Sequence, residues 1–160
     1  MSESVYKVIE VIGTSPDSWE ALGAAIAGYE TARAYALERQ QFGYPIAGYQ
    51  LVQEKLAGMV ADITAMFCTM LRLSQLVDQG KASMPQVSLA KMQNCRQARA
   101  ILADARDILG GNGIVLDYGV ARHLCDMEAI YTYEGTDSVQ ALILGREVTG
   151  FNAFMPPAHK

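Results

Sequence analysis

The sequence predicts an all-α protein, an antiparallel helical bundle with one short N-terminal β-strand. Apolar residues recur at three- and four-residue spacing through several long segments, which is the period of a helix. Short turns rich in Gly and Pro separate those segments. Hydrophobic residues make up 51% of the 160 residues and charged residues 19%, so the chain has enough apolar side chains for one folded core.

The strand is expected over residues 5–12 (VYKVIEVI), which are β-branched and aromatic and end at Gly13. Because a lone strand leaves backbone groups unpaired on both edges, it must pair with another chain, lie against the bundle or be disordered. Helices are then expected over residues 16–40, 48–79, 85–109, 120–127 and 137–150. Pro16 suits a first helical turn, and residues 110–113 (GGNG) stop the third helix. The tail, residues 155–160, is expected to be frayed.

Composition excludes several functional classes. A net charge of -4 argues against a nucleic-acid-binding surface. Cys68, Cys95 and Cys125 form neither a close pair nor an even set, so each is expected to be a small buried residue in a reducing compartment. No metal site is expected, because His123 and His159 form no ligand cluster. Without a signal peptide, or an uninterrupted apolar run that predicts a membrane span, the expected location is the cytoplasm.

A first candidate motif is Tyr131-Thr-Tyr-Glu-Gly-Thr136, just before the last helix. Glu134 stands among uncharged and aromatic residues, where desolvation would raise its pKa and make it a stronger base. Gly135 permits close backbone approach, and Thr136 can cap the helix or donate to a ligand. The alternative is an acidic residue that the helix dipole stabilises, and from the residues alone this alternative is favoured.

Two further motifs suggest anion contacts. Leu109-Gly-Gly-Asn-Gly113 can expose backbone amides to a phosphate, or it can be a helix C-cap followed by a tight turn. In Glu38-Arg-Gln-Gln-Phe-Gly-Tyr-Pro45, Arg39 can pair with a phosphate or with the end of its own helix. Phe42 can pack or stack on a ring.

The three motifs in this order resemble the C-terminal helical domain of the acyl-CoA dehydrogenases. The resemblance runs from about residue 19 to residue 154, and the motifs are most similar to those of the glutaryl-CoA dehydrogenase branch. It rests on YALERQQFGYPIAGYQL, KMQNCRQA, ARDILGGNGI, YTYEGT and ALILGREVTGFNAF.

The resemblance implies a set of roles. Glu134 is the base that takes the α-proton of an acyl-CoA thioester, while the β-hydride passes to FAD. Gly135 contacts substrate and Thr136 contacts FAD. The other FAD-contacting positions are Arg39, Phe42, Gln50, Asp107, Ile108, Leu109, Gly110, Gly111 and Phe154. The first three act across a subunit interface in a homo-oligomer, a tetramer or dimer, and electrons leave to electron-transfer flavoprotein.

The sequence also departs from the family, which limits how far these implied roles apply. The family's N-terminal and middle domains are not in these residues, so the free chain is expected to be weakly active or inactive. Thr14 stands where the glutaryl branch has a carboxylate-binding arginine. Residues 1–18 instead resemble the opening of dodecins, small flavin-storing proteins, which predicts a leader over 1–18, a helical domain over 19–154 and a tail over 155–160. The alternative functions are a non-catalytic oligomerisation module and a flavin-binding fragment.

Overall fold

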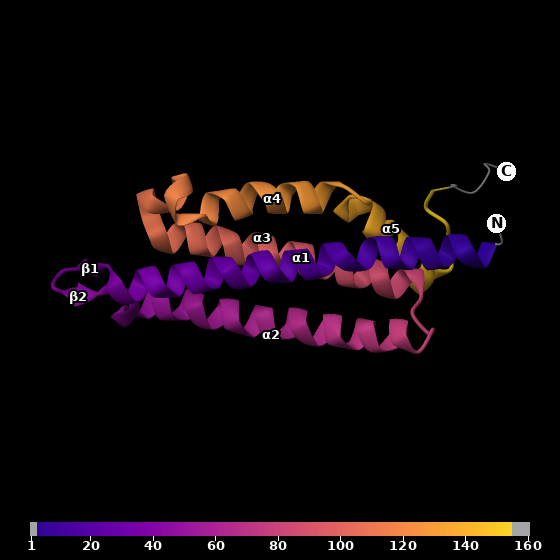
Figure 1. Cartoon of the computed structure of the whole chain (residues 1–160), viewed down its shortest axis with the longest axis horizontal. Coiled ribbons are helices and arrows are strands. Elements are labelled where there is room, and N and C mark those ends of the chain that lie inside the picture. Colours follow the sequence, from indigo (N-terminus) through magenta and orange to yellow (C-terminus); the bar gives the residue numbers. More distant parts are fainter. Residues whose placement is uncertain (1–2, 155–160) are drawn as a thin grey trace.

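The computed structural model describes residues 3–154, with side chains from residue 16 onward. Five helices make a bundle, as predicted: α1 (Glu3–Glu38), α2 (Gln50–Asp78), α3 (Met84–Leu109), α4 (Val120–Thr132) and α5 (Asp137–Thr149). Two-residue strands β1 (Gln40–Gln41) and β2 (Tyr44–Pro45) form a hairpin at one end (Figure 1). Short 3-10 turns cover Ile46–Gly48, Gly110–Ile114 and Leu116–Tyr118.

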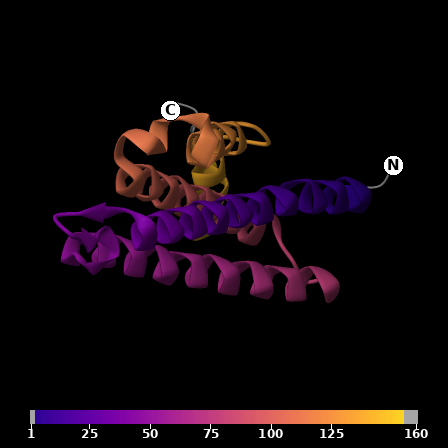
Figure 2. The same cartoon turned by 60° about the vertical axis from the view of Figure 1, so that its left-hand side comes forward.

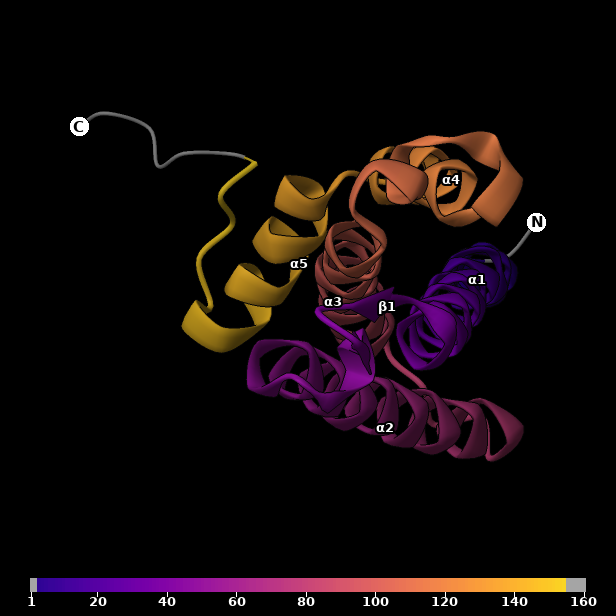
Figure 3. The same cartoon turned by 90° about the vertical axis from the view of Figure 1, so that its left-hand side faces the viewer.

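Helix α3 lies at the centre of the bundle and contacts the other four helices (Figure 3). Its inward face carries Val87, Cys95, Ala98, Ile101 and Leu102, all nearly or fully buried. Small alanines on α1 let that helix pack closely against α3, and Gly28 faces Leu102 with no room for a Cβ atom. Apolar side chains at helical spacing therefore form the core, although Leu89 and Ala100, which were predicted to face it, are exposed.

The predicted strand at residues 5–12 is wrong, because α1 already begins at Glu3 and contains Pro16 within it. A helix satisfies its backbone hydrogen bonds within the segment, whereas a lone strand needs a partner at each edge. The first turns of α1 extend beyond the neighbouring helices (Figure 2). The resemblance of residues 1–18 to dodecins stays a prediction, and the frayed tail at 155–160 lies outside the described residues.

The other helix boundaries agree with the prediction to within two residues, except that α4 continues to Thr132 rather than ending at residue 127. Helix α3 begins with a capping box, in which Ser83 and Gln86 satisfy each other's backbone groups, with Pro85 in its first turn. The hairpin was not predicted. Its two central residues, Phe42 and Gly43, have φ angles of 53° and 79°, as a tight two-residue hairpin turn requires.

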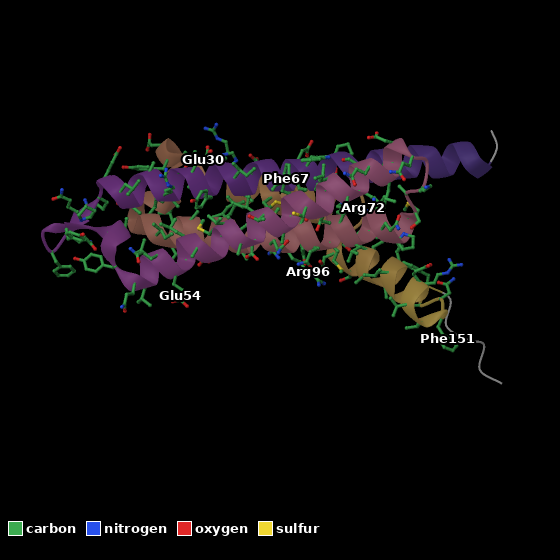
Figure 4. The ribbon with its side chains drawn as sticks, turned by 90° about the horizontal axis from the view of Figure 1, so that it is seen from below. Glu30, Glu54, Phe67, Arg72, Arg96 and Phe151 are labelled. Atoms are coloured by element: carbon green, nitrogen blue, oxygen red, sulfur yellow. The ribbon has the colours of Figure 1, made fainter. Side chains whose placement is uncertain are left out.

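Helix α2 differs from the rest in its exposed apolar surface. By length and composition it is apolar enough to cross a membrane, with mean hydropathy 1.5 over an 18-residue window that is 22% buried. The expectation that no segment could span a membrane is therefore unsupported. Phe67, which is labelled on α2 in Figure 4, is half exposed. It meets Trp19 of α1 edge-on, at 6.3 Å between ring centroids.

Candidate functional site

One candidate site lies where the hairpin meets the glycine-rich loop. A cavity of about 340 Å³ is lined by Tyr35, Arg39, Gln41, Ile46 and the segment from Asp107 to Asn112. Asn112 donates from Nδ2 to the Tyr35 hydroxyl at 3.1 Å, which ties the loop to α1. The structure therefore brings together two of the three sequence motifs.

Backbone packing sets the shape of this loop. Gly113 is buried, and a Cβ atom there would lie 2.3 Å from the Arg106 carbonyl oxygen, so no other residue fits. Gly110 and Gly111 are exposed, with no atom within 4 Å of a Cβ built at either position. The Gly110 amide already donates to the Asp107 carbonyl oxygen as the C-cap of α3, so the helix-cap alternative is confirmed for Gly110. The exposed backbone of Gly111 remains for the predicted phosphate contact.

The charges around the cavity favour an anion. Arg39 is exposed, and it has no ion-pair partner among the residues that the structure describes. Asp107 is paired with Lys55 and with Arg106, the latter at 3.0 Å. The Lys55 ammonium is the main cause that lowers the pKa of Asp107. The one carboxylate lining the cavity is therefore neutralised, and the Arg39 guanidinium remains available.

The second candidate site is the turn between α4 and α5, which carries Glu134. The Glu134 side chain is exposed, so the burial that its aromatic neighbours suggested is not found in this chain. Its φ angle is 54°, and that of Gly135 is 95°. The left-handed region costs a residue with a side chain about 1–2 kcal/mol, so surrounding contacts must hold Glu134 there.

Two buried side chains supply those contacts. The Lys91 ammonium on α3 donates to the Tyr133 carbonyl oxygen. The Gln140 amide on α5 donates from Nε2 to the carbonyl oxygens of Glu134, at 3.0 Å, and Gly135, at 3.2 Å. Three successive carbonyls around the candidate base are therefore held from two different helices. We call Lys91 and Gln140 the carbonyl clamp.

Helix α1 completes the support of the turn. Lys91 is 1% exposed and its Nζ lies 3.0 Å from Oδ2 of Asp17, which is 4% exposed. Burial raises the pKa of Asp17, and Lys91 opposes that shift. The Tyr133 hydroxyl donates to Oε2 of Glu20 at 3.0 Å, and desolvation together with this bond raises the pKa of Tyr133 to about 12.

The two candidate sites lie at different places along the bundle. Asp17 and Arg39 are 22 positions apart in and just after α1, which is about 33 Å at 1.5 Å per residue. Arg39 of one chain is therefore remote from Glu134 of the same chain. The predicted site residues do not all meet within one chain.

The remaining predicted positions are spread between these sites. Phe42 is 96% exposed at the hairpin tip, and Gln50, the first residue of α2, is also exposed. Thr136 occupies the N-cap position of α5, although its side chain makes no capping hydrogen bond. Phe154 is exposed beyond α5. Ile108 and Leu109 are buried, so they can offer a ligand little more than their backbone.

Asp17, Lys91 and Gln140 are site residues that were not predicted from the sequence. A lysine in a helix is usually a surface residue, but Lys91 lies four positions from both Val87 and Cys95 on the core face of α3. That spacing was the available signal. Cys95 is buried as expected, whereas Cys68 and Cys125 are exposed, which corrects the prediction for those two. Among the described residues there is no cluster that could hold a metal ion.

Comparison with known proteins agrees with this arrangement. Residues 18–149 match the family described as acyl-CoA dehydrogenase, C-terminal domain. A probable acyl-CoA dehydrogenase of Bacillus subtilis is 34% identical over 128 residues, which are 80% of this chain and 34% of that protein. The chain thus spans about a third of the length of the curated relatives it matches.

Solved structures show the same likeness. Glutaryl-CoA dehydrogenase from Mycobacterium smegmatis superposes with a TM-score of 0.89 and 42% identity, over 91% of this chain and 38% of that one. A second structure, a glutaryl-CoA dehydrogenase from the same organism in complex with FADH2, has a TM-score of 0.86 and 38% identity, over 89% and 37%.

The fold is that of the C-terminal helical domain of the acyl-CoA dehydrogenase class. This chain belongs to the acyl-CoA dehydrogenase family, by its C-terminal domain.

Proposed function

We propose that the chain provides the base and part of the flavin cradle for FAD-dependent α,β-dehydrogenation of an acyl-CoA, of the glutaryl-CoA dehydrogenase kind. The observation that carries the proposal is Glu134, an exposed carboxylate on a turn whose backbone the carbonyl clamp holds in a left-handed conformation. A surface glutamate without a function has no reason to be held in this unfavourable backbone conformation. The likeness to glutaryl-CoA dehydrogenase structures supports the same activity.

In this proposal Glu134 takes the α-proton of the thioester, since a carboxylate on a fixed backbone can be held within reach of one carbon atom. The Gly135 backbone contacts the substrate beside it, and Thr136 contacts the cofactor. The chemistry that FAD supplies when bound is acceptance of the β-hydride. Thr14 stands at the position that, by the resemblance, binds the distal carboxylate in the glutaryl branch.

The cavity at the hairpin fits the diphosphate end of FAD. Arg39 supplies a free guanidinium, which binds phosphate oxygens through paired N–H groups. Gly110 and Gly111 carry no side chain that would block the approach of a phosphate beside it. Phe42 and Gln50, an exposed apolar and an exposed amide side chain near the hairpin, extend the contact in this proposal. Phe154 follows α5, whose end lies away from the hairpin, so it is not part of this cavity (Figure 1). Asp107 is balanced by Lys55, so it does not repel the phosphates.

Separation of the two sites supports a homo-oligomer. Asp17, which pairs with Lys91 beneath the Glu134 turn, and Arg39 at the cavity are 22 positions apart, about 33 Å along α1. The exposed apolar side chains of α2, Leu51, Val60, Phe67 and Leu71, would then be buried between subunits. Light scattering should find dimers or tetramers without detergent, whereas a chain recovered only on neutral lipid vesicles would contradict this. Electron-transfer flavoprotein as electron acceptor and a cytoplasmic location remain expectations.

Flavin binding can be tested on the chain itself. Added FAD should raise the melting temperature of the wild-type chain, because a ligand that binds only the folded state stabilises it. Arg39→Ala should lose most of that rise, and Glu134→Gln should keep it. A melting temperature unaffected by millimolar FAD would contradict the flavin cradle.

Catalysis is best tested in a chimera, in which residues 16–154 replace the corresponding domain of the Mycobacterium smegmatis glutaryl-CoA dehydrogenase. We expect glutaryl-CoA oxidation with an artificial acceptor, and its loss in the Glu134→Gln chimera. A folded, FAD-loaded chimera with no turnover, or with turnover that Glu134→Gln leaves unchanged, would refute the proposed base.

A further inference from the structure

The backbone around Glu134 is held by side chains that have no part in the proposed reaction. The Tyr133, Glu134 and Gly135 carbonyls accept from Lys91 and Gln140, and the donors come from α3 and α5, which meet beneath the turn. Because each peptide group is planar, a hydrogen bond to its carbonyl oxygen restrains the orientation of the whole group. Three such hydrogen bonds therefore restrain the backbone on both sides of Glu134. The direction in which the carboxylate leaves the backbone follows from those planes.

The clamp is dry. Lys91 and Gln140 are 1% and 3% exposed. The space bounded by Lys91, Cys95, Gly135 and Gln140 leaves no room for a water molecule. Water therefore cannot replace either donor without the structure opening, and loss of a donor must free the turn.

Asp17 makes the lysine part of the clamp possible. A buried ammonium is costly unless it is paired and hydrogen-bonded, and Asp17 lies 3.0 Å from Lys91 Nζ. The lysine also lies 5.4 Å from the centre of the Tyr133 ring, a cation–π contact with the residue whose carbonyl it holds. Asp17 thus connects α1 to the turn through Lys91.

We propose that Lys91, anchored by Asp17, and Gln140 are positioning residues that set the direction of the Glu134 carboxylate. The proposal rests on the proposed function for its catalytic consequence, but the backbone consequence can be measured without it. Neither residue has to touch substrate or cofactor. Each acts through the backbone of Glu134.

The first test measures the turn in the full chain by NMR. Asp17→Leu with Lys91→Met removes both charges and keeps the volume, so the fold should survive. The backbone order parameters of Glu134 and Gly135 should fall from about 0.85 to below about 0.6. Gln140→Met should do the same. Arg96→Met is the matched control, since it removes a surface contact between α3 and α5 without touching the three carbonyls.

The second test uses the chimera described above. Both variants should lower kcat about ten- to a hundredfold with little change in KM, because the base is displaced while binding remains. Folded variants with unchanged order parameters would overturn the proposal. So would a failure of both variants to fold, because the groups would then support the whole bundle. If the turn loosens but even Glu134→Gln leaves turnover intact, the proposed function fails and the positioning of Glu134 stands.

Discussion

Arg96 on α3 donates two hydrogen bonds to Asp137, the first residue of α5: from Nε to Oδ1 at 2.7 Å and from Nη2 to Oδ2 at 2.8 Å. This paired geometry joins the central helix to the helix that follows the Glu134 turn. Asp137 also lies in the first turn of α5, where the helix dipole favours a negative charge. The pair lies at the surface rather than beneath the turn, since Arg96 is about half exposed.

Acid should weaken this junction. The Arg96 hydrogen bonds lower the pKa of Asp137, so the folded state favours the charged form. The stability this provides is present above the ordinary aspartate pKa of 3.8 and is lost as the pH falls through the lowered value. Asp137→Asn should reduce the free energy of unfolding by under about 1 kcal/mol at neutral pH, since solvent screens the pair. Denaturant curves across pH should show the difference shrinking toward pH 3, and an equal difference at every pH would refute the assignment.

Gly135 should tolerate no side chain. Its φ angle is 95°, and a Cβ atom there would lie 2.6 Å from Nε2 of Gln140. Gly135→Ala should therefore lower the free energy of unfolding by more than about 1 kcal/mol. Gly145→Ala is the matched control, because that glycine is inside α5 with nothing near its Cβ position and should be stabilising by up to about 1 kcal/mol. Equal effects of the two substitutions in urea unfolding would contradict the geometry.

The buried pair of Asp17 and Lys91 should be strongly non-additive. Asp17→Leu alone leaves the lysine charge buried without its partner and should cost about 3–5 kcal/mol of unfolding free energy. Adding Lys91→Met should recover most of that loss, because neither charge then remains. A double-mutant cycle by urea denaturation measures the coupling, and additive losses would show that the two groups do not interact.

Cys95 should be chemically silent in the folded chain. Burial raises its pKa to about 11, so at pH 8 only about one thiol in a thousand is ionised. Cys125 is exposed and provides the internal control. A thiol reagent followed by peptide mapping should label Cys125 in minutes and Cys95 only after unfolding. Equal labelling of the two under native conditions would contradict the burial of Cys95.

Most of the helix boundaries depend on local sequence signals, so they could be predicted from the sequence alone. The helical period, the turn glycines and the proline positions place helices α2, α3 and α5 to within two residues, and the three motifs place the chain in its family. The strand predicted from composition at residues 5–12 was wrong. The β-branched side chains favoured a strand there, but the structure continues α1 through the segment, where the backbone bonds to itself.

The tertiary structure alone decided how the motifs meet. It places Arg39 beside the glycine loop, and it places Glu134 farther along the bundle, above Lys91 and Asp17. It also places Asp17, Lys91 and Gln140 beneath one turn, although 74 positions separate Asp17 from Lys91. The physical reason is that a buried charge is tolerated only with its partner, and which residue becomes that partner depends on how α1 packs against α3.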